Sequence, residues 1–203
     1  MDKTRSSLLR RVRDPRDEES WQEFFALYHP ILVSYLRKEG LNDHDAADVV
    51  QTVFQSLLKK MPAFELNRDR GRFRTWLWRV MYNAVVDWRR RKGRQEKAEG
   101  QAYSSSASRP VPDEPDEWRN DLRKRVISFA LERVKAKTQQ KTWNCFQLHI
   151  LDGQTSADVA DALGITVNSV NVNCSRVLGR VRECCREYLE DLDDDTSIDL
   201  MSR

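Results

Sequence analysis

Apolar residues recur every three to four positions along most of this chain, which is the spacing of one helix face. No segment shows the alternation of apolar and polar residues that is typical of a strand. The spacing predicts helices over residues 3–13, 43–60, 73–92, 117–136, 141–151, 156–163 and 167–188, with a further helix between Asp14 and Gly40. The sequence therefore indicates an all-α fold.

Local signals mark several of the predicted helix ends. Asp14 followed by Pro15 is a start signal, because proline suits the first position of a helix. Pro30 should kink or split the helix that begins there, since proline lacks an N–H and crowds the preceding turn. Gly40 should end this helix, and Asn42 can cap the next one.

The predicted helix 43–60 has one apolar and one polar side. Its apolar side holds Val49, Val50, Val53, Phe54, Leu57 and Leu58. Its polar side holds Asp45, Asp48, Thr52, Gln55 and Lys59, with Gln51 at the boundary. Taken alone, such a polar side is the ordinary solvated face of a surface helix.

The predicted helix 73–92 carries three tryptophans and five arginines. A core stripe is expected from Phe73, Trp76, Leu77, Val80, Met81, Ala84 and Trp88. On the other side lie Trp78, Tyr82, Val86 and Arg89, flanked by Thr75 and Arg79. Aromatic rings beside guanidinium groups suit nucleic acid, because rings stack on bases and cations pair with phosphates. The alternative is that Trp78 and Tyr82 pack on neighbouring helices and the arginines are only solvated.

Residues 156–176 have the spacing of a helix–turn–helix. Ser156 can cap the first helix, and Gly164 supplies the backbone freedom of the turn. A small core is expected from Val159, Leu163, Ile165 and Val170, with Ala160 at the helix crossing. The second helix should point Asn168, Asn171, Val172, Ser175 and Arg176 outward, where a recognition helix meets base edges and phosphates. The alternative is a helical packing element with no role on DNA.

Charge and composition divide the chain. The net charge is only +3, but residues 1–95 carry +7, residues 96–118 carry −4, residues 119–188 carry +5 and residues 189–203 carry −5. The stretch QAYSSSASRPVPDEP, residues 101–115, cannot bury a core and is predicted to be flexible. We therefore predict two small helical domains, 1–95 and 119–188, joined by a flexible acidic linker, 96–118, and followed by an acidic tail, 189–203.

Composition also limits the class of protein. No run of about 18 apolar residues suggests a membrane span, and the N-terminus lacks the apolar core of a signal peptide, so we expect a cytoplasmic protein. Cys145 and His149 share a helix face, but without a CxxC pair buried thiols are favoured over a zinc site. His29 and His44 form no recognisable triad. No catalytic site, metal or cofactor is predicted.

Two segments in a fixed order resemble a known family. DAADVVQTVF followed by GRFRTWLWRVMYNAVVDWRRR resembles region two of bacterial sigma factors, and in particular their extracytoplasmic-function (ECF) group. SADVADALGITVNSV resembles region four of the same group. The resemblance implies a helical bundle for region two and a helix–turn–helix for region four, with no region three between them.

The resemblance also implies roles for particular residues. Asp45, Asp48, Gln51 and Gln55 would lie at the contact with RNA polymerase, on the β′ clamp helices. The loop Asn67, Arg68, Asp69, Arg70, Gly71 and Arg72 would hold a flipped base, and Arg74, Trp78, Arg79, Tyr82, Asn83, Arg89 and Arg90 would follow the −10 DNA, with Asp87 in a positioning role. The −35 element would be read by Asn168, Ser169, Asn171, Val172, Ser175 and Arg176, with region four docked on the β flap.

One departure from the family concerns the −35 contact. Many ECF factors carry basic residues where this chain has Asn171 and Asn173. The −35 contact is therefore expected to rest more on amide hydrogen bonds and on Arg176, Arg180 and Arg182.

The sequence thus predicts a sigma factor that binds core RNA polymerase, directs it to promoters and melts the −10 DNA without being an enzyme. An anti-sigma factor or other regulator is a further partner that the family allows. The rival hypothesis is a stand-alone helix–turn–helix regulator that binds duplex DNA without polymerase. A nucleic-acid-processing enzyme would need an acidic metal cluster or a nucleophile motif, and neither is present in the sequence. The acidic tail is expected to be a solvated segment, or else to compete for the basic DNA surface or engage a regulator.

Overall fold

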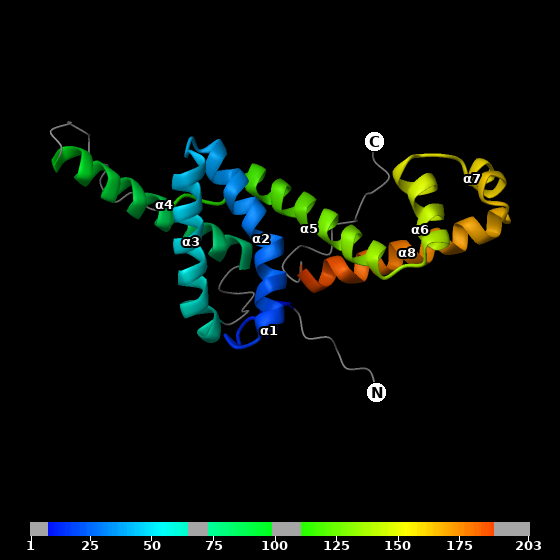
Figure 1. Cartoon of the computed structure of the whole chain (residues 1–203), viewed down its shortest axis with the longest axis horizontal. Helices are drawn as coiled ribbons and strands as arrows, with labels where there is room; N and C mark the ends of the chain where they lie inside the picture. Colours follow the sequence, from blue (N-terminus) through cyan, green and yellow to red (C-terminus); the bar gives the residue numbers. More distant parts are fainter. Residues whose placement is uncertain (1–7, 65–72, 99–110, 189–203) are drawn as a thin grey trace. The chain divides into compact units, whose positions relative to one another are not determined.

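The computed structural model describes residues 8–64, 73–98 and 111–188, the side chains of 95–98 excepted, and every regular element in these ranges is helical (Figure 1). The predicted all-α fold is confirmed. The chain divides into two compact units, and the boundary falls within α5 (Asp116–Ala136), between Arg123 and Lys124. None of the described helices combines the length and apolarity that crossing a membrane requires.

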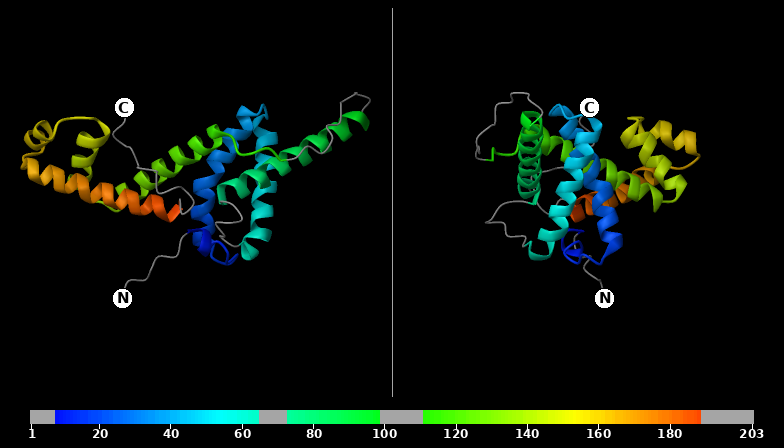
Figure 2. Two further views of the ribbon diagram at one scale, coloured as in Figure 1. Left: turned by 180° about the vertical axis from the view of Figure 1, so that it is seen from behind. Right: turned by 60° about the vertical axis from the view of Figure 1, so that its left-hand side comes forward.

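The unit 8–123 is built on three long helices. It contains α1 (Leu8–Arg11), α2 (Glu18–Lys38), α3 (Asp43–Lys60), the short turn η1 (Met61–Ala63) and α4 (Phe73–Ala98). Helix α3 packs on both α2 and α4, and α2 and α3 lie side by side (Figure 2). The core takes fully buried side chains from all three, among them Phe24, Leu36, Val53, Leu57, Leu77 and Met81. The expected core stripe of α4 is confirmed, with Trp76 and Trp88 only half-buried at its margins.

Helix α2 differs from its sequence prediction in two respects. It begins at Glu18, where the Asp17 carboxylate accepts the backbone N–H of Ser20 at 3.0 Å, and not at Asp14-Pro15. It also runs unbroken through Pro30. A proline inside a helix costs about 3 kcal/mol, but buried residues on both sides of Pro30 hold this helix in the core. Packing therefore outweighs the local signal.

The connection from α2 to α3 follows the sequence prediction. Gly40 has a φ of 86°, a left-handed conformation that glycine adopts without a steric penalty. The side-chain oxygen of Asn42 then accepts the backbone N–H of Asp45 at 2.9 Å. This bond satisfies one of the free donors at the start of α3, so the predicted helix 43–60 has the predicted bounds.

The unit that starts at Lys124 holds a helix–turn–helix. Its elements after α5 are α6 (Gln140–Phe146), the widened turn η3 (Gln147–Leu151), α7 (Ser156–Leu163) and α8 (Val167–Tyr188). Its small core contains Cys145, Val159, Ala160, Val170 and Cys174, with Leu163 and Ile165 partly buried against it. The predicted bounds of α7 and α8 are confirmed, and the predicted helix 141–151 is divided into α6 and η3.

The caps of the two helix–turn–helix helices are threonines. Thr155, not Ser156 as predicted, caps α7 by accepting the backbone N–H of Asp158 at 3.2 Å. Gly164 ends α7 with a φ of 61°, the left-handed conformation that the sequence prediction requires of it. Because Thr155 makes the cap, the hydroxyl of Ser156 is left for another partner.

Candidate nucleic-acid interface

Helix α4 presents a polar side that the sequence assigned to −10 DNA. Arg79, Asn83, Arg89 and Arg90 are exposed there, and Tyr82 is half-buried. Arg89 lies 3.7 Å from a carboxylate oxygen of Glu39, and Arg90 lies 3.9 Å from Asp87. Exposed pairs at such distances contribute little and are screened by salt, so these guanidinium groups remain available to phosphates.

Two further residues assigned to this surface are covered. Trp78 is only 4% exposed, and its indole Nε1 donates a hydrogen bond to the carbonyl oxygen of Pro112 at 3.0 Å. Arg74 is also buried, and its Nε lies 2.6 Å from the carboxylate of Glu114. The sequence interpretation of Trp78 as an exposed stacking ring therefore needs correction. The alternative interpretation, that the Trp78 ring packs on a neighbouring segment, agrees with the structure.

The segment that covers these residues is the end of the expected linker and the start of α5. Trp118 is fully buried, with its ring centroid 5.6 Å from that of Tyr35 and 5.9 Å from that of Trp78. Lys38 on α2 donates to Glu117 at 2.7 Å and to Asp121 at 2.8 Å. We call residues 112–121 the acidic cover. The expected flexible linker is thus corrected at its end, since its last residues pack against α2 and α4.

The sequence did not predict the acidic cover, because this segment is mostly polar and contains only one large apolar residue. That residue, Trp118, stands in a run of charged residues, and a tryptophan in such a run is the signal that could have predicted the contact. Within the described residues, Glu114 Oε2 and Trp118 Nε1 are buried without a hydrogen-bond partner. A buried unpaired polar atom costs about 1–3 kcal/mol. The acidic cover is therefore held less firmly than its apolar contacts alone imply.

The loop assigned to a flipped base lies outside the described residues. Asn67, Arg68, Asp69, Arg70, Gly71 and Arg72 all belong to the stretch 65–72 between η1 and α4. Their assignment stays a prediction from the family resemblance.

The polar side of α3 separates into structural and exposed residues. The Asp45 carboxylate accepts from Lys92 Nζ and from Asn42 Nδ2, both at 2.9 Å, which ties α3 to α4. Asp48 lies 3.5 Å from His44 at the surface, and Gln51 and Gln55 are exposed. Of the four residues assigned to polymerase, Asp48, Gln51 and Gln55 are therefore free to meet a partner, while Asp45 holds the fold.

Two exposed apolar residues extend this surface. Leu58, which the sequence placed on the apolar side, is 44% exposed and lies one turn beyond Gln55. Phe25 on α2 is 47% exposed and has its ring centroid 4.8 Å from that of the buried Phe54. Exposed large apolar side chains beside a polar face are typical of a protein-binding surface.

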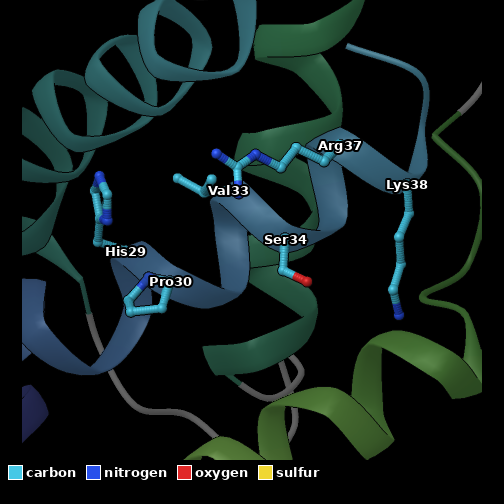
Figure 3. A pocket seen from close by; sticks show the side chains of 6 residues that line it. All are labelled: His29, Pro30, Val33, Ser34, Arg37 and Lys38. Carbon is cyan, nitrogen blue, oxygen red and sulfur yellow. The ribbon is translucent and has the colours of Figure 1, made fainter. Parts of the chain in front are cut away.

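A surface hollow lies along α2, lined by His29, Pro30, Val33, Ser34, Arg37 and Lys38 (Figure 3). Its cations are already engaged, since Arg37 donates to Asp43 at 2.7 Å and Lys38 is held by the acidic cover. Burial lowers the pKa of His29, which disfavours its charged form. The hollow thus offers little positive charge for an anion, and no ligand is assigned to it.

Helix α8 carries the residues of the helix–turn–helix that the sequence predicted to point outward. Asn168, Asn171, Val172, Ser175 and Arg176 are all exposed. Ser169 is half-buried, and its hydroxyl lies 2.8 Å from that of Thr166, which also accepts the Ser169 backbone N–H at 3.1 Å. Ser169 therefore belongs to the start of the helix more than to its outward face. Asn173 faces the core, where its Nδ2 lies 3.5 Å from the Cys145 sulfur.

Three of the four cysteines are buried thiols, as the sequence favoured. Cys145, Cys174 and Cys185 are buried, and Cys184 is half-exposed. Burial raises the pKa of Cys174 to about 11 and that of Cys185 to about 12, so neither is a thiolate near neutral pH. Within the described ranges, no three His, Cys, Asp or Glu side chains cluster as a metal site requires.

Comparison with known proteins points to one class of protein. The sequence model of sigma-70 region 2 matches residues 24–95. The ECF RNA polymerase sigma factor RpoE of Cereibacter sphaeroides is 23% identical over 177 residues, which are 87% of this chain and 92% of that protein. The ferric citrate uptake sigma factor FecI of Escherichia coli is 28% identical over 74% of this chain and 82% of that protein.

A third relative is of the same kind, and a solved structure also matches this chain. The ECF RNA polymerase sigma factor SigW of Bacillus subtilis is 22% identical over 87% of this chain and 92% of that protein. The structure of the sigma factor RpoE with the anti-sigma factor NepR from Bartonella quintana is 19% identical, covers 83% of this chain and 98% of that one, and has a TM-score of 0.35.

Proposed function

Because the chain belongs to the ECF group of the sigma-70 family of RNA polymerase sigma factors, we propose how its surfaces divide the work of transcription initiation. Residues 1–95 act as region two and residues 119–188 as region four. The comparisons give no support to a stand-alone regulator. The chain acts by binding and without a catalytic step of its own, in the cytoplasm, where its polymerase works.

The outward side of α3 is the proposed polymerase contact. Asp48, Gln51 and Gln55 are exposed along it, and Leu58 with Phe25 adds apolar area at one end. An interface of this kind combines an apolar centre with polar groups around it. Asp45 stabilises this side of α3 indirectly, because its bond with Lys92 holds α3 against α4. The observation that carries this proposal is the exposure of amide and apolar side chains on a helix inside the matched sigma-70 region 2.

The polar side of α4 is the proposed −10 surface. Arg79, Asn83, Arg89 and Arg90 are placed to meet phosphates and bases of the opened strand. Flipping a base costs a few kcal/mol, and stacking on an aromatic ring returns about 1–3 kcal/mol per base. Binding can therefore drive melting without ATP when polymerase holds the factor in place. The loop Asn67–Arg72 keeps its proposed role as the pocket for a flipped base.

A role of Trp78 and Arg74 on DNA requires the acidic cover to move. Both side chains are buried under residues 112–121 in the present arrangement. The carboxylates of the acidic cover pair with cations of this surface, and Trp118 packs on the Trp78 ring. Phosphates would pair with the same cations, and bases would stack on the same ring. We propose that DNA and the acidic cover occupy this side of α4 in turn.

The outward face of α8 is the proposed −35 reader. Its exposed amides and Arg176 suit base edges and phosphates in a major groove. Core RNA polymerase, through its β′ clamp helices and β flap, and promoter DNA are thus the proposed partners. An anti-sigma factor is the third partner that membership of the group implies.

The test is selection of bound genomic DNA by the holoenzyme reconstituted from this chain and core polymerase, followed by run-off transcription on the selected fragments. We expect transcripts from defined start sites only when both components are present. If the chain does not bind core polymerase and no promoter-dependent transcripts form, the proposal is contradicted. A footprint on duplex DNA by the chain alone, unchanged by polymerase, would favour the stand-alone regulator.

A further inference from the structure

Three polar side chains join the inside of the helix–turn–helix to the outward face of α8. His149 on η3 has its Nδ1 at 2.7 Å from the carbonyl oxygen of Gln154. Its Nε2 lies 3.3 Å from the hydroxyl of Ser156 on α7. That hydroxyl donates to Oδ1 of Asn171 on α8, 3.0 Å away. One end of the exposed Asn171 amide is therefore already bonded within the protein.

The hydrogen-bond donors and acceptors that link His149, Ser156 and Asn171 can be counted. A backbone carbonyl only accepts, so His149 Nδ1 must carry a hydrogen and donate to Gln154. Ser156 has one hydroxyl hydrogen, and the shorter of its two distances assigns this hydrogen to Asn171. With Oδ1 bonded to Ser156, Asn171 has only its NH₂ group left for an outside partner.

We propose that Ser156 fixes the Asn171 amide so that it reads only hydrogen-bond acceptors on a base. This inference rests on the proposed role of α8 at the −35 element. Guanine, adenine and thymine each present an acceptor in the major groove, whereas cytosine presents only the N4 donor. Asn171 thus excludes cytosine at the base it contacts, and Ser156 is a positioning residue for this selection.

The free amide of an asparagine does not make this choice by itself. An unrestrained amide can turn over and present either its oxygen or its NH₂ group, so it accepts donors and acceptors alike. The bond from Ser156 removes one of these two orientations. The neighbouring amides are held differently, since Asn173 faces Cys145 in the core and Asn168 is exposed at the start of α8.

The chain offers a substitution that removes the restraint and leaves the fold. Ser156→Ala deletes the hydroxyl, while Thr155 still caps α7 through its bond with the Asp158 N–H. Alanine also has the highest helix propensity, so α7 should form as before. Thermal unfolding of the variant within a few degrees of the parent will establish this.

The experiment measures base preference at each −35 position with the reconstituted holoenzyme and a randomised −35 library. For the parent chain we expect cytosine to be disfavoured on the order of fivefold at one position, the value of about 1 kcal/mol for one hydrogen bond. Ser156→Ala should reduce this preference to less than about twofold there and leave the other positions unchanged. Asn171→Ala should do the same, and adding Ser156→Ala to it should change nothing more.

A polarity test and a matched control complete the design. Asn171→Asp presents only acceptors and should shift the same position towards cytosine, read as relative preference because the added charge weakens all binding. Gln139→Ala, which removes an exposed amide just before α6, should leave that position unaltered. A Ser156→Ala profile identical to that of the parent, or an aspartate variant with no shift towards cytosine, overturns the inference and leaves the proposed function intact. A parent chain with no −35 selectivity at all contradicts the proposed role of α8 itself.

Discussion

The indole Nε1 of Trp78 donates a hydrogen bond to the carbonyl oxygen of Pro112 at 3.0 Å, across 34 positions of the sequence. This bond joins the N-terminal part of α4 to the acidic cover. The Trp78 ring, which suits base stacking, is thus buried against Trp118 and Tyr35. Access of DNA to this ring is therefore a competition between two ligands of the same surface, one of them part of the chain.

Trp118→Ala should expose Trp78. The substitution removes a fully buried ring, which typically costs about 3–5 kcal/mol of packing, and so weakens the hold of the acidic cover on α4. We expect the free chain to bind a fluorescent single-stranded −10 oligonucleotide about fivefold more tightly, which corresponds to about 1 kcal/mol. Fluorescence anisotropy measures this directly.

Trp143→Ala is the matched control for this prediction. Trp143 is also buried, but its ring centroid lies 5.3 Å from that of Phe146 in the other unit. Its loss should lower stability without raising the affinity for the oligonucleotide. Equal affinities for the parent and for Trp118→Ala would show that the acidic cover does not compete with DNA.

The Arg74–Glu114 pair should stabilise the fold far more than the Arg37–Asp43 pair. Both pairs have N···O distances near 2.7 Å, but the side chains of the first are 11% and 10% exposed and those of the second are 55% and 80% exposed. Water and salt screen the exposed pair, which should contribute less than about 1 kcal/mol. Removing one partner of a buried pair leaves an uncompensated charge and costs about 3–5 kcal/mol.

Double-mutant cycles to alanine, read by urea unfolding, compare the two pairs. The cycle at Arg74 and Glu114 should give a coupling energy of about 2 kcal/mol, limited by the free energy that holds the acidic cover in place. The cycle at Arg37 and Asp43 should give a few tenths of a kcal/mol. Similar coupling in both cycles would mean that the cover is open in solution for most of the time.

Substitutions on α3 should separate polymerase binding from stability. Gln51→Ala and Gln55→Ala remove exposed amides and should weaken binding to core polymerase with little change in unfolding. Asp45→Ala breaks the bonds to Lys92 and Asn42 and should lower stability by about 1–2 kcal/mol. Gln22→Ala, an exposed amide on α2, is the control and should change neither quantity. Full polymerase affinity in the double variant of Gln51 and Gln55 would remove α3 from the proposed contact.

Two glycines in the second unit should respond oppositely to alanine. Gly164 has a φ of 61°, so a Cβ is strained there although no atom lies within 4 Å of it, and Gly164→Ala should destabilise by about 1–2 kcal/mol. Gly179 lies inside α8 with equally open space, and Gly179→Ala should stabilise by about 0.5–1 kcal/mol. Thermal unfolding should thus move the two midpoints in opposite directions. A stabilising Gly164→Ala would contradict the left-handed turn.

Sequence predicted the local structure well where local signals and packing agree. The bounds of α3, α7 and α8 follow from apolar spacing, the Asn42 cap and the turn at Gly164. At Pro30 the local signal opposed the buried residues around it, and packing prevailed. For the cap of α7, Thr155 and Ser156 are adjacent and chemically similar, so sequence alone could not choose between their hydroxyl groups.

Contacts distant in sequence were beyond the reach of pattern reasoning. The acidic cover meets α2 and α4 through three ion pairs, a backbone carbonyl and one tryptophan, and none of these produces a periodic pattern. The bond between Ser156 and Asn171 likewise joins two helices and depends on the crossing geometry of the helix–turn–helix. Helical spacing could place Asn171 outward but could not specify which edge of its amide is free.

Permanganate footprinting of a selected promoter measures melting of the −10 DNA, the step on which the proposed function depends. Permanganate oxidises unpaired thymines, so it reports opening of the −10 DNA. We expect reactive −10 thymines with this chain and core polymerase together, without ATP, and none with either component alone. Unreactive thymines in a complex that contains chain, polymerase and promoter would contradict the proposed function.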